Sequence, residues 1–553
     1  MKKSLSLVAL LLCLALGLRA ESGTCGANLT WEYANGTLTI SGYGDMQNYK
    51  SSNSPWYSLR TSIVQVTFPA DLTSIGDYAF YGCTKLRLVT IPNKVATIGQ
   101  YAFSGCTAMT RATLGTGVET IATYAFNNCD ALTSVTLQNN ITSIGSEAFR
   151  DCDALTAITI PSSVVTIESS AFYSCDALSQ VTIQNGVKTI GEYAFRDCFN
   201  LLSVTLPESL TSINQQAFRY CSSLSSVIIP SKITSIADGL FAECTSLTSV
   251  TLPTNLLEIG EGAFYQCAFK QIAIPNKVNK LGNAVFKDCK QLTSITLPTG
   301  ITEIPAGAFH QCYNLTEVII PEGVTTIQSS AFASCNLFTI TLPKTLQQIN
   351  YGGYGFLNYS TYYAGAFEGN PNLASIVFPE NVNTIGEQAF EGCTNLSSVV
   401  LNDGLSSLGD YAFSGCSALT NITIPQTITT IPARCFLNCT ALSQVRLKEG
   451  LLSIKSHAFD GCSSLHTISL PNTITTLDEA FYGCTGLTEI DIPESVAVLN
   501  GTFCGCSNLS KVTLPPSITT IGEYAFYHCT SLASLRLPLN LVIMHESAFQ
   551  GCS

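Results

Sequence analysis

The sequence from Ile75 to Thr97 reads IGDYAFYGCTKLRLVTIPNKVAT, and its pattern returns along most of the 553-residue chain. The recurring unit is Ile-Gly-x-x-Ala-Phe-x-x-Cys-x-x-Leu-x-x-Val-x-Leu-Pro-x-x-Val-x-x, in which x is variable, and its usual period is 23 residues. Self-similarity at such a period is typical of solenoids, whose coils stack on one another. The phenylalanine slot is filled in all 21 units, by Phe80, Phe103, Phe126, Phe149, Phe172, Phe195, Phe218, Phe241, Phe264, Phe286, Phe309, Phe332, Phe367, Phe390, Phe413, Phe436, Phe459, Phe481, Phe503, Phe526 and Phe549.

Each unit contains the signal of a strand and of a turn. In Leu-x-x-Val-x-Leu-Pro, apolar residues alternate with polar ones, and proline ends the pairing. The segment Ala-Phe-x-x-Cys predicts a short helical or 3-10 turn with its apolar residues on one side. Neither part can bury its apolar face alone, so neighbouring coils must cover it. We therefore expect a solenoid of about 21 coils with stacked parallel strands and a ladder of buried phenylalanines.

The composition favours a folded chain and gives no sign of nucleic-acid binding. Hydrophobic residues make up 46% and charged residues 12%, which is the opposite of the balance found in disordered chains. The formal net charge of −12 offers no basic patch for a phosphate backbone. We expect no nucleic-acid partner.

Residues 1–20 have the pattern of a secretory signal peptide. Lys2 and Lys3 precede the apolar run Leu5–Leu18, and Ala20 provides a small residue for cleavage. The run is shorter than the roughly 20 residues that a membrane span requires, which favours cleavage over an uncleaved anchor. We expect a secreted or cell-surface protein with no transmembrane span in the mature chain.

Residues 21–64 do not follow the repeat and predict a β-hairpin cap, whereas residues 65–553 are repeats. Two alternating segments flank Asn35-Gly36, a pair that favours a tight hairpin turn. Such a hairpin would cover the strand edge of the first coil. Trp31 and Trp56, the only tryptophans, both lie in this segment, and we expect them to pack within the cap.

An insertion lengthens one unit, because Phe332 and Phe367 are 35 residues apart. The added residues lie at about 351–363 and combine tyrosine with glycine, asparagine and serine, a composition found in adaptable recognition loops. A binding loop and a simple insertion that covers the adjoining coil are both compatible with this pattern. The candidate partner-binding residues are Tyr351, Tyr354, Phe356, Tyr359, Tyr362 and Tyr363.

The outward position of each strand is often threonine, which β-propensity and solubility explain without any partner. Toward the C-terminus this row changes to Arg446, Ser469, Asp491, Thr513 and Arg536. The change in chemistry makes Arg446, Asp491 and Arg536 a second set of candidate partner-binding residues.

The cysteines follow the phenylalanine slot by three residues on the apolar side of the unit. Free cysteine packs as a small hydrophobic residue, so we expect buried thiols in preference to disulfide-linked coils. Asn370 replaces the cysteine once. The closely spaced pairs Cys435/Cys439 and Cys504/Cys506 each contain one member of the repeat slot, and we expect no metal site there.

The sequence suggests no catalytic site and no cofactor. A hydrolytic triad needs a histidine beside a nucleophile and an acid. The five histidines occupy variable positions of separate coils, and we expect them to be solvated surface residues. They are His310, His457, His466, His528 and His545.

The unit, as in Ile75–Cys83, resembles the BspA-type leucine-rich repeat of bacterial and protist surface antigens, and Thr24–Gly26 with Gly36–Gly42 resembles the leader often found before such repeats. The resemblance implies a leucine-rich-repeat solenoid that adheres to host or matrix proteins or to other cells, and it carries over no catalytic residue. The alternatives are a structural protein that self-associates through an uncapped C-terminal end and, third, an enzyme or small-ligand receptor.

Overall fold

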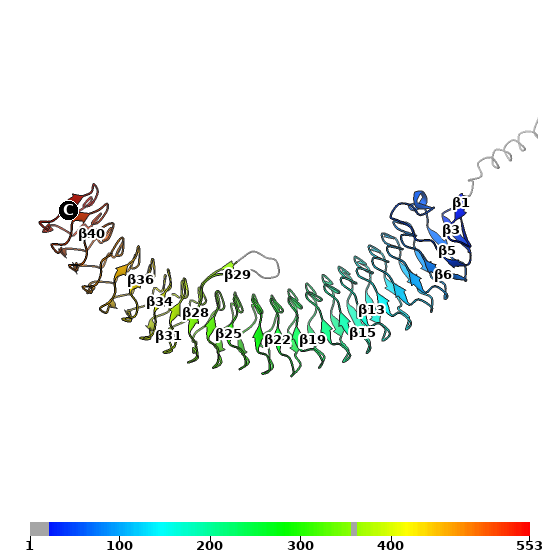
Figure 1. The fold of residues 1–553 in the computed structure, drawn as a ribbon, viewed down its shortest axis with the longest axis horizontal. Helices are drawn as coiled ribbons and strands as arrows, with labels where there is room; N and C mark the ends of the chain where they lie inside the picture. Colours follow the sequence, from blue (N-terminus) through cyan, green and yellow to red (C-terminus); the bar gives the residue numbers. More distant parts are fainter. Residues whose placement is uncertain (1–20, 355–361, 553) are drawn as a thin grey trace, which may run out of the picture. The chain divides into compact units, whose positions relative to one another are not determined.

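The structure, a computed structural model, describes residues 21–354 and 362–552. The chain divides into two compact units, Met1–Ile233 with Glu243–Leu247 and Thr234–Ala242 with Thr248–Ser553. Each unit is a parallel β-solenoid whose coils contain roughly 23 residues, as the repeat predicts (Figure 1). Among the described residues the helical content is one 3-10 turn, η1 (Tyr57–Leu59).

The first unit begins with a cap of three antiparallel strands, β1 (Glu21–Thr24), β2 (Leu29–Ala34) and β3 (Thr37–Gly42). Asn35 and Gly36 join β2 to β3 with φ values of 51° and 83°, the left-handed conformations that a tight hairpin turn requires. Strand β3 then pairs in parallel with the first strand of the repeats, so the hairpin covers that edge. Trp56 is fully buried, and its ring stacks on Phe80 at 5.6 Å.

The predicted strand of each coil forms a first row in this unit. Its central side chain is buried and its flanking side chains are mostly exposed, because side chains alternate along a strand. The pairs Thr90–Thr113 and Thr182–Thr205 face each other in parallel register. The strands are β5 (Gln65–Thr67), β7 (Leu88–Thr90), β9 (Arg111–Thr113), β11 (Ser134–Val135), β13 (Ala157–Ile160), β15 (Gln180–Ile183), β17 (Ser203–Thr205) and β19 (Ser226–Ile228).

A second row of short strands, which we did not predict, precedes the phenylalanine of each coil. Most are a Thr-Ile or Ser-Ile pair whose isoleucine is buried, and Ile98 lies beside Ile121 in register. In the first unit they form an eight-stranded sheet. Its strands are β4 (Gly44–Asp45), β6 (Leu72–Ile75), β8 (Thr97–Ile98), β10 (Thr120–Ile121), β12 (Ser143–Ile144), β14 (Thr166–Ile167), β16 (Thr189–Ile190) and β18 (Ser212–Ile213).

The second unit repeats both rows and adds a two-stranded hairpin. The first row contains β21 (Ser249–Thr251), β24 (Ser294–Thr296), β26 (Glu317–Ile319), β31 (Ser375–Val377), β33 (Ser398–Val400), β35 (Asn421–Thr423), β37 (Gln444–Arg446), β39 (Glu489–Asp491) and β41 (Lys511–Thr513). The second row contains β20 (Ser235–Ile236), β22 (Glu258–Ile259), β23 (Lys280–Leu281), β25 (Glu303–Ile304), β27 (Thr326–Ile327), β28 (Gln348–Ile349), β32 (Thr384–Ile385), β34 (Ser407–Leu408), β36 (Thr430–Ile431), β38 (Ser453–Ile454), β40 (Val498–Leu499), β42 (Thr520–Ile521) and β43 (Ile543–Met544). The hairpin consists of β29 (Gly353–Tyr354) and β30 (Tyr362–Tyr363).

The phenylalanines form the predicted ladder in the core of each unit. Those from Phe80 to Phe218 and from Phe241 to Phe526 are fully buried. Their rings stack nearly in parallel, as in Phe126 and Phe149, whose centroids are 5.3 Å apart with an interplanar angle of 1°. Burial of each ring removes apolar surface from water and contributes roughly 1.5–3 kcal/mol.

The segment around each phenylalanine is a series of turns, and the expected helical or 3-10 turn is absent from the described coils. Tyr78 and Gly82 have φ values of 54° and 70°, which interrupt a right-handed helix on both sides of the phenylalanine. The backbone N–H groups donate to the next coil: Tyr78 to the Gln100 carbonyl at 2.8 Å and Phe80 to the Ala102 carbonyl at 2.7 Å. Bonds between coils therefore alternate with bonds within the turn, such as that from the Tyr81 N–H to the Tyr78 carbonyl at 3.2 Å.

The described cysteines are free thiols, and all are buried except Cys552, which is half-buried. The thiol of Cys106 donates to the Phe80 carbonyl at 3.3 Å, and most later ladder cysteines repeat this bond to the preceding coil. Burial raises the pKa of the Cys106 thiol well above its ordinary value. The cysteine slot thus packs the core as the sequence predicts.

Candidate functional site

The predicted residues Arg446 and Asp491 lie on the exposed face of the first strand row. Arg446 ends β37 and Asp491 ends β39, and both side chains are exposed. Arg536 is also exposed but lies outside the described strands. Because Ser469 occupies the coil between the first two residues, no ion pair joins Arg446 to Asp491 among the described residues. Arg446 and Asp491 therefore belong to one row without forming a cluster, and Arg536 is exposed outside that row.

The same row carries exposed apolar residues that we did not single out from the sequence. Ile319, Val377 and Val400 are 64%, 63% and 51% exposed, at a position where other coils have threonine. Val377 and Val400 are neighbours in the parallel register of β31 and β33, and Ile319 is bridged to Thr341. The signal was present in the sequence as the loss of threonine from its slot.

The tyrosine-rich insertion is described only in part. Tyr351 is exposed, and Tyr354 in β29 pairs with Tyr362 in the antiparallel strand β30. Tyr363 pairs with Gly353 in the same hairpin. Phe356 and Tyr359 lie outside the described residues. The contribution of this insertion to binding remains a prediction from its composition.

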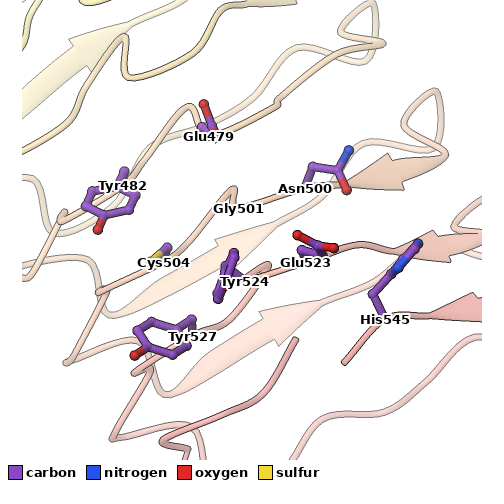
Figure 2. Close-up of a pocket in the computed structure, with 9 residues that line it drawn as sticks. All are labelled: Glu479, Tyr482, Asn500, Gly501, Cys504, Glu523, Tyr524, Tyr527 and His545. Atoms are coloured by element: carbon purple, nitrogen blue, oxygen red, sulfur yellow. The ribbon is translucent and has the colours of Figure 1, made fainter. Parts of the chain in front are cut away.

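A pocket of about 670 Å³ opens on the turn edge of four consecutive coils in the second unit. Figure 2 shows Tyr482, Cys504 and Tyr527 on one side of it, and Asn500 and His545 on the other. The complete lining is Glu479, Tyr482, Asn500, Gly501, Cys504, Glu523, Tyr524, Tyr527 and His545. These residues come from positions two to four residues before each ladder phenylalanine and from the position directly after it.

Two neighbouring coils are one residue short at this edge. In regular coils the phenylalanine follows the second-row isoleucine by five positions, as Phe80 follows Ile75. Leu477 and Phe481 are only four apart, as are Leu499 and Phe503. The phenylalanine rings nevertheless remain stacked in the core. Since both ends of the segment stay anchored, the edge is drawn inward and a hollow forms. We noted the phenylalanine positions in the sequence but not this consequence of the shorter spacing.

Small residues are central to the pocket. Gly501 has a φ of 53°, and a Cβ there would lie 2.9 Å from the Glu479 Cγ atom, so a side chain would crowd the opening. Cys504 takes the slot that holds a tyrosine in the coils on either side, and its thiol interacts with the Tyr482 hydroxyl. Burial is the main cause that raises the pKa of Cys504, so its thiol stays protonated at neutral pH and is a poor nucleophile.

Carboxylates and aromatic rings form the walls. The Ser456 hydroxyl donates to the Glu479 carboxylate at 2.5 Å, and the His457 Nε2 atom is 3.5 Å from the same group. Glu523 is exposed, and no ion pair joins its carboxylate to another described residue. The rings of Tyr524 and Tyr527 meet edge to face at 5.3 Å. The pocket therefore presents negative charge next to ring faces.

One histidine differs from our expectation of a solvated surface residue. His310 is 7% exposed because its slot, directly after the ladder phenylalanine, packs beside Lys287 and Asp288 of the preceding coil. Burial, followed by the positive charge of Lys287, lowers the pKa of His310 to about 4. His457, by contrast, is half-buried and its Nδ1 atom lies 2.9 Å from the Asp460 carboxylate.

Residues 21–354 and 362–552, which the structure describes, contain neither a metal-binding cluster nor a membrane-spanning helix. No group of three or more histidine, cysteine, aspartate or glutamate side chains is arranged to hold a metal ion in that part of the chain. No helix formed by those residues has the length and apolar character needed to cross a membrane.

Comparison with known proteins identifies the repeat. A family profile described as "BspA type Leucine rich repeat region (6 copies)" matches residues 53–177, 165–293, 234–362, 360–480 and 477–553. Solved structures of leucine-rich repeat proteins from Eubacterium ventriosum and Bacteroides ovatus are 23% and 25% identical to the chain, with TM-scores of 0.41 and 0.40. The first match covers 68% of this chain and 95% of the other, and the second covers 81% and 94%. A leucine rich cell surface protein from Faecalibacterium prausnitzii is 24% identical over 89% of this chain and 94% of its own, with a TM-score of 0.32. No curated protein matches the chain.

Proposed function

Because the chain belongs to the BspA-type leucine-rich repeat family, a class of repeat scaffolds that typically bind proteins, we propose that it is an exported scaffold for adhesion to host, matrix or other-cell proteins. The pattern of residues 1–20 supports export to the surface or the medium. The partner would contact the exposed face of the first strand row. Many weak contacts along consecutive coils would then add up to one stable attachment.

The exposed apolar residues of that row carry this proposal. Ile319, Val377 and Val400 are exposed at a position where many other coils have threonine. Exposed apolar side chains cost solubility, and contiguous patches of them mark interaction surfaces. Folding does not require them, since the side chain points away from the core. Arg446 and Asp491 would extend the same contact face with charge.

The test compares two sets of matched variants in binding to a panel of purified matrix and cell-surface proteins. Val377→Thr with Val400→Thr places the common residue of the row at both positions and should weaken binding by about tenfold, as loss of apolar contact area predicts. Leu452→Thr removes a similarly exposed apolar side chain, 48% exposed, outside this row and should leave affinity unchanged. Equal affinities of all proteins for every panel member would contradict the proposal.

The tyrosine-rich insertion is a second candidate contact. Tyrosine supplies a large contact area with little loss of conformational freedom. Replacing residues 351–363 by a short Gly-Ser link, with the ladder intact, should weaken partner binding. Unchanged affinity with an unchanged circular dichroism spectrum would assign the insertion a covering role only.

Self-association is a second candidate function. Residues 537–544 include the exposed apolar side chains Leu537, Leu539, Val542, Ile543 and Met544. An apolar face of this kind can pair with a second copy. Light scattering over a range of concentrations distinguishes assembly from a monomeric binder, and Leu539→Ser with Val542→Ser should reduce any assembly that uses this face.

A further inference from the structure

Elsewhere on the turn edge, the chain places its own cations on carboxylates and tyrosine rings. In the first unit, the Arg150 Nη1 atom is 2.7 Å from the Glu147 carboxylate, and its guanidinium lies 4.9 Å from the centre of the Tyr173 ring. The Arg219 guanidinium, almost fully buried, is 2.9 Å from the Glu243 carboxylate. These residues occupy the variable positions around the ladder phenylalanines, so this edge repeatedly holds guanidinium groups.

The second unit shows the same chemistry close to the pocket. The Arg434 guanidinium lies 5.4 Å from the Tyr411 ring centre, and its Nη1 atom donates to the Tyr411 hydroxyl at 2.8 Å. Arg434 and Tyr411 occupy the same slot in neighbouring coils, the slot that holds Tyr524 farther along the unit.

The pocket offers these acceptors, and its basic side chain is His545. Its nine lining residues include two carboxylates and three tyrosines but no lysine or arginine. Tyr482 and Tyr524 are 42% and 47% exposed, so their rings are accessible. The short coils draw the edge inward at the point where other coils place a cationic side chain. A cation from outside would therefore meet two carboxylates and exposed ring faces.

We propose that the pocket formed by Glu479, Tyr482, Glu523, Tyr524 and Tyr527 binds a guanidinium or ammonium group, presented as the arginine or lysine side chain of a partner protein. This inference rests on the proposed protein-binding function. The volume of about 670 Å³ lies in the range of sites for small ligands and holds one long side chain with its flanking backbone. The net charge of −12 would attract a basic partner segment.

The lining residues would make different contacts with the cation. Glu523, which has no ionic partner among the described residues, would accept hydrogen bonds from the cation. The Ser456 hydroxyl and His457 hold the Glu479 carboxylate in place at the opposite wall. Tyrosine ring faces attract cations through their negative quadrupole, and Gly501 adds no side chain beside Glu479 in the lining.

The test is a ligand-observed NMR titration of the full chain with four probes. They are the capped tripeptide Gly-Arg-Gly, its lysine analogue, its citrulline analogue and tetramethylammonium chloride. Citrulline has nearly the shape of arginine but no charge. We expect the arginine and lysine peptides to bind about tenfold more tightly than the citrulline peptide, which lacks the charged contact.

Matched variants locate the site. Glu523→Gln should weaken binding of the arginine peptide about fivefold or more. Tyr524→Gln should have the same effect, because each substitution removes one contact with the cation. Gln388 fills the slot of Tyr524 in another coil with a φ of 55°, so this exchange preserves the backbone. Glu494→Gln removes an exposed charge from the short coil outside the pocket and should leave affinity unchanged.

Three results would overturn the inference: equal affinity for arginine and citrulline peptides, an unchanged affinity in Glu523→Gln, or no binding of either basic peptide. Tetramethylammonium binding as tightly as the arginine peptide would overturn the assignment to a protein side chain. None of these readings uses a natural partner. Failure of the pocket is thus distinguishable from failure of the scaffold proposal, which the strand-row variants test.

Discussion

Asn370 takes the place of a ladder cysteine, and its side-chain amide donates to the Phe332 carbonyl at 2.8 Å. The thiol bonds to the same carbonyl position in other coils, so asparagine preserves the bond across the long insertion. Its Oδ1 atom also accepts the Leu337 N–H at 3.2 Å. In regular coils the corresponding N–H bonds within its turn, as Leu86 does to the Cys83 carbonyl at 3.0 Å. The coil after Cys335 is one residue shorter there, and Asn370 supplies the missing acceptor.

Asn370→Leu should therefore destabilise the second unit more than its volume suggests. Asn370 is fully buried, and removal of its amide leaves backbone groups without partners at about 1–3 kcal/mol each. Asn370→Cys restores the thiol bond to Phe332 and should lose only about half as much stability. Urea unfolding measures both variants. Equal losses would show that side-chain volume, and not the hydrogen bonds, decides this position.

Loss of one ladder ring should weaken the core strongly. Phe149 stacks between Phe126 and Phe172 with both centroid distances at 5.3 Å. Phe149→Ala should lower the free energy of unfolding by about 3–5 kcal/mol through the cavity that it leaves. Phe149→Leu fills most of that space and should cost less. Denaturant unfolding followed by circular dichroism provides the comparison, and a loss below about 1 kcal/mol for alanine would contradict a close-packed ladder.

The ladder thiols should resist modification in the folded protein. Burial raises the pKa of Cys83 to about 12, and thiolate is the reactive form. Ellman's reagent at pH 8 should react slowly with the native chain and fully after unfolding in guanidinium chloride. Thr90→Cys, on the exposed strand row, supplies a positive control that reacts at once. Fast reaction of the native ladder at the rate of this control would contradict its burial.

His310 should make the second unit sensitive to acid. Its pKa is about 4 in the folded state against 6.5 for the ordinary group, so the unfolded chain binds a proton first as the pH falls. Stability is therefore complete above pH 6.5 and decreases toward pH 4, by about 3 kcal/mol in order of magnitude. His310→Gln introduces the residue type that another coil has in this slot, at Gln550. The substitution should remove this part of the decrease in stability. The exposed residue His466 provides the control variant His466→Gln, whose pH profile should match that of the unmodified chain. An unchanged pH profile for His310→Gln would contradict the assignment.

The repeat alone was sufficient to predict the first strand row and the core, but not the second row of short strands. Alternation around Val89 places Thr90 outward, and Phe80 recurs at fixed offsets that only stacking can satisfy. The turn differs from its prediction because its conformation depends on the neighbouring coil. Tyr78 adopts a left-handed backbone while bonding to Gln100, and the same slot accepts glutamate, glutamine, serine and histidine elsewhere. A slot so variable in sequence gives no local signal of its backbone conformation.

The candidate sites were predicted less completely. Arg446 and Asp491 are exposed in the row that the sequence predicts, and the structure adds that no ion pair joins them among the described residues. The pocket near Glu523 depends on two coils that each lack one residue. The phenylalanine spacing reveals this loss in the sequence, but its effect on the turn edge depends on the stacked neighbouring coils. His310 was expected at the surface because a single sequence position does not reveal how far the preceding coil covers it.

The most direct test of the scaffold account is site-specific photo-cross-linking to the panel protein that binds most tightly. Benzoylphenylalanine is placed at Val377, at Val400 or, as the control, at Leu452, in the otherwise unchanged chain. We predict that the partner cross-links through Val377 and Val400 and not through Leu452. Cross-linking through Leu452 alone, or equally from all three positions, would contradict binding on the exposed strand row.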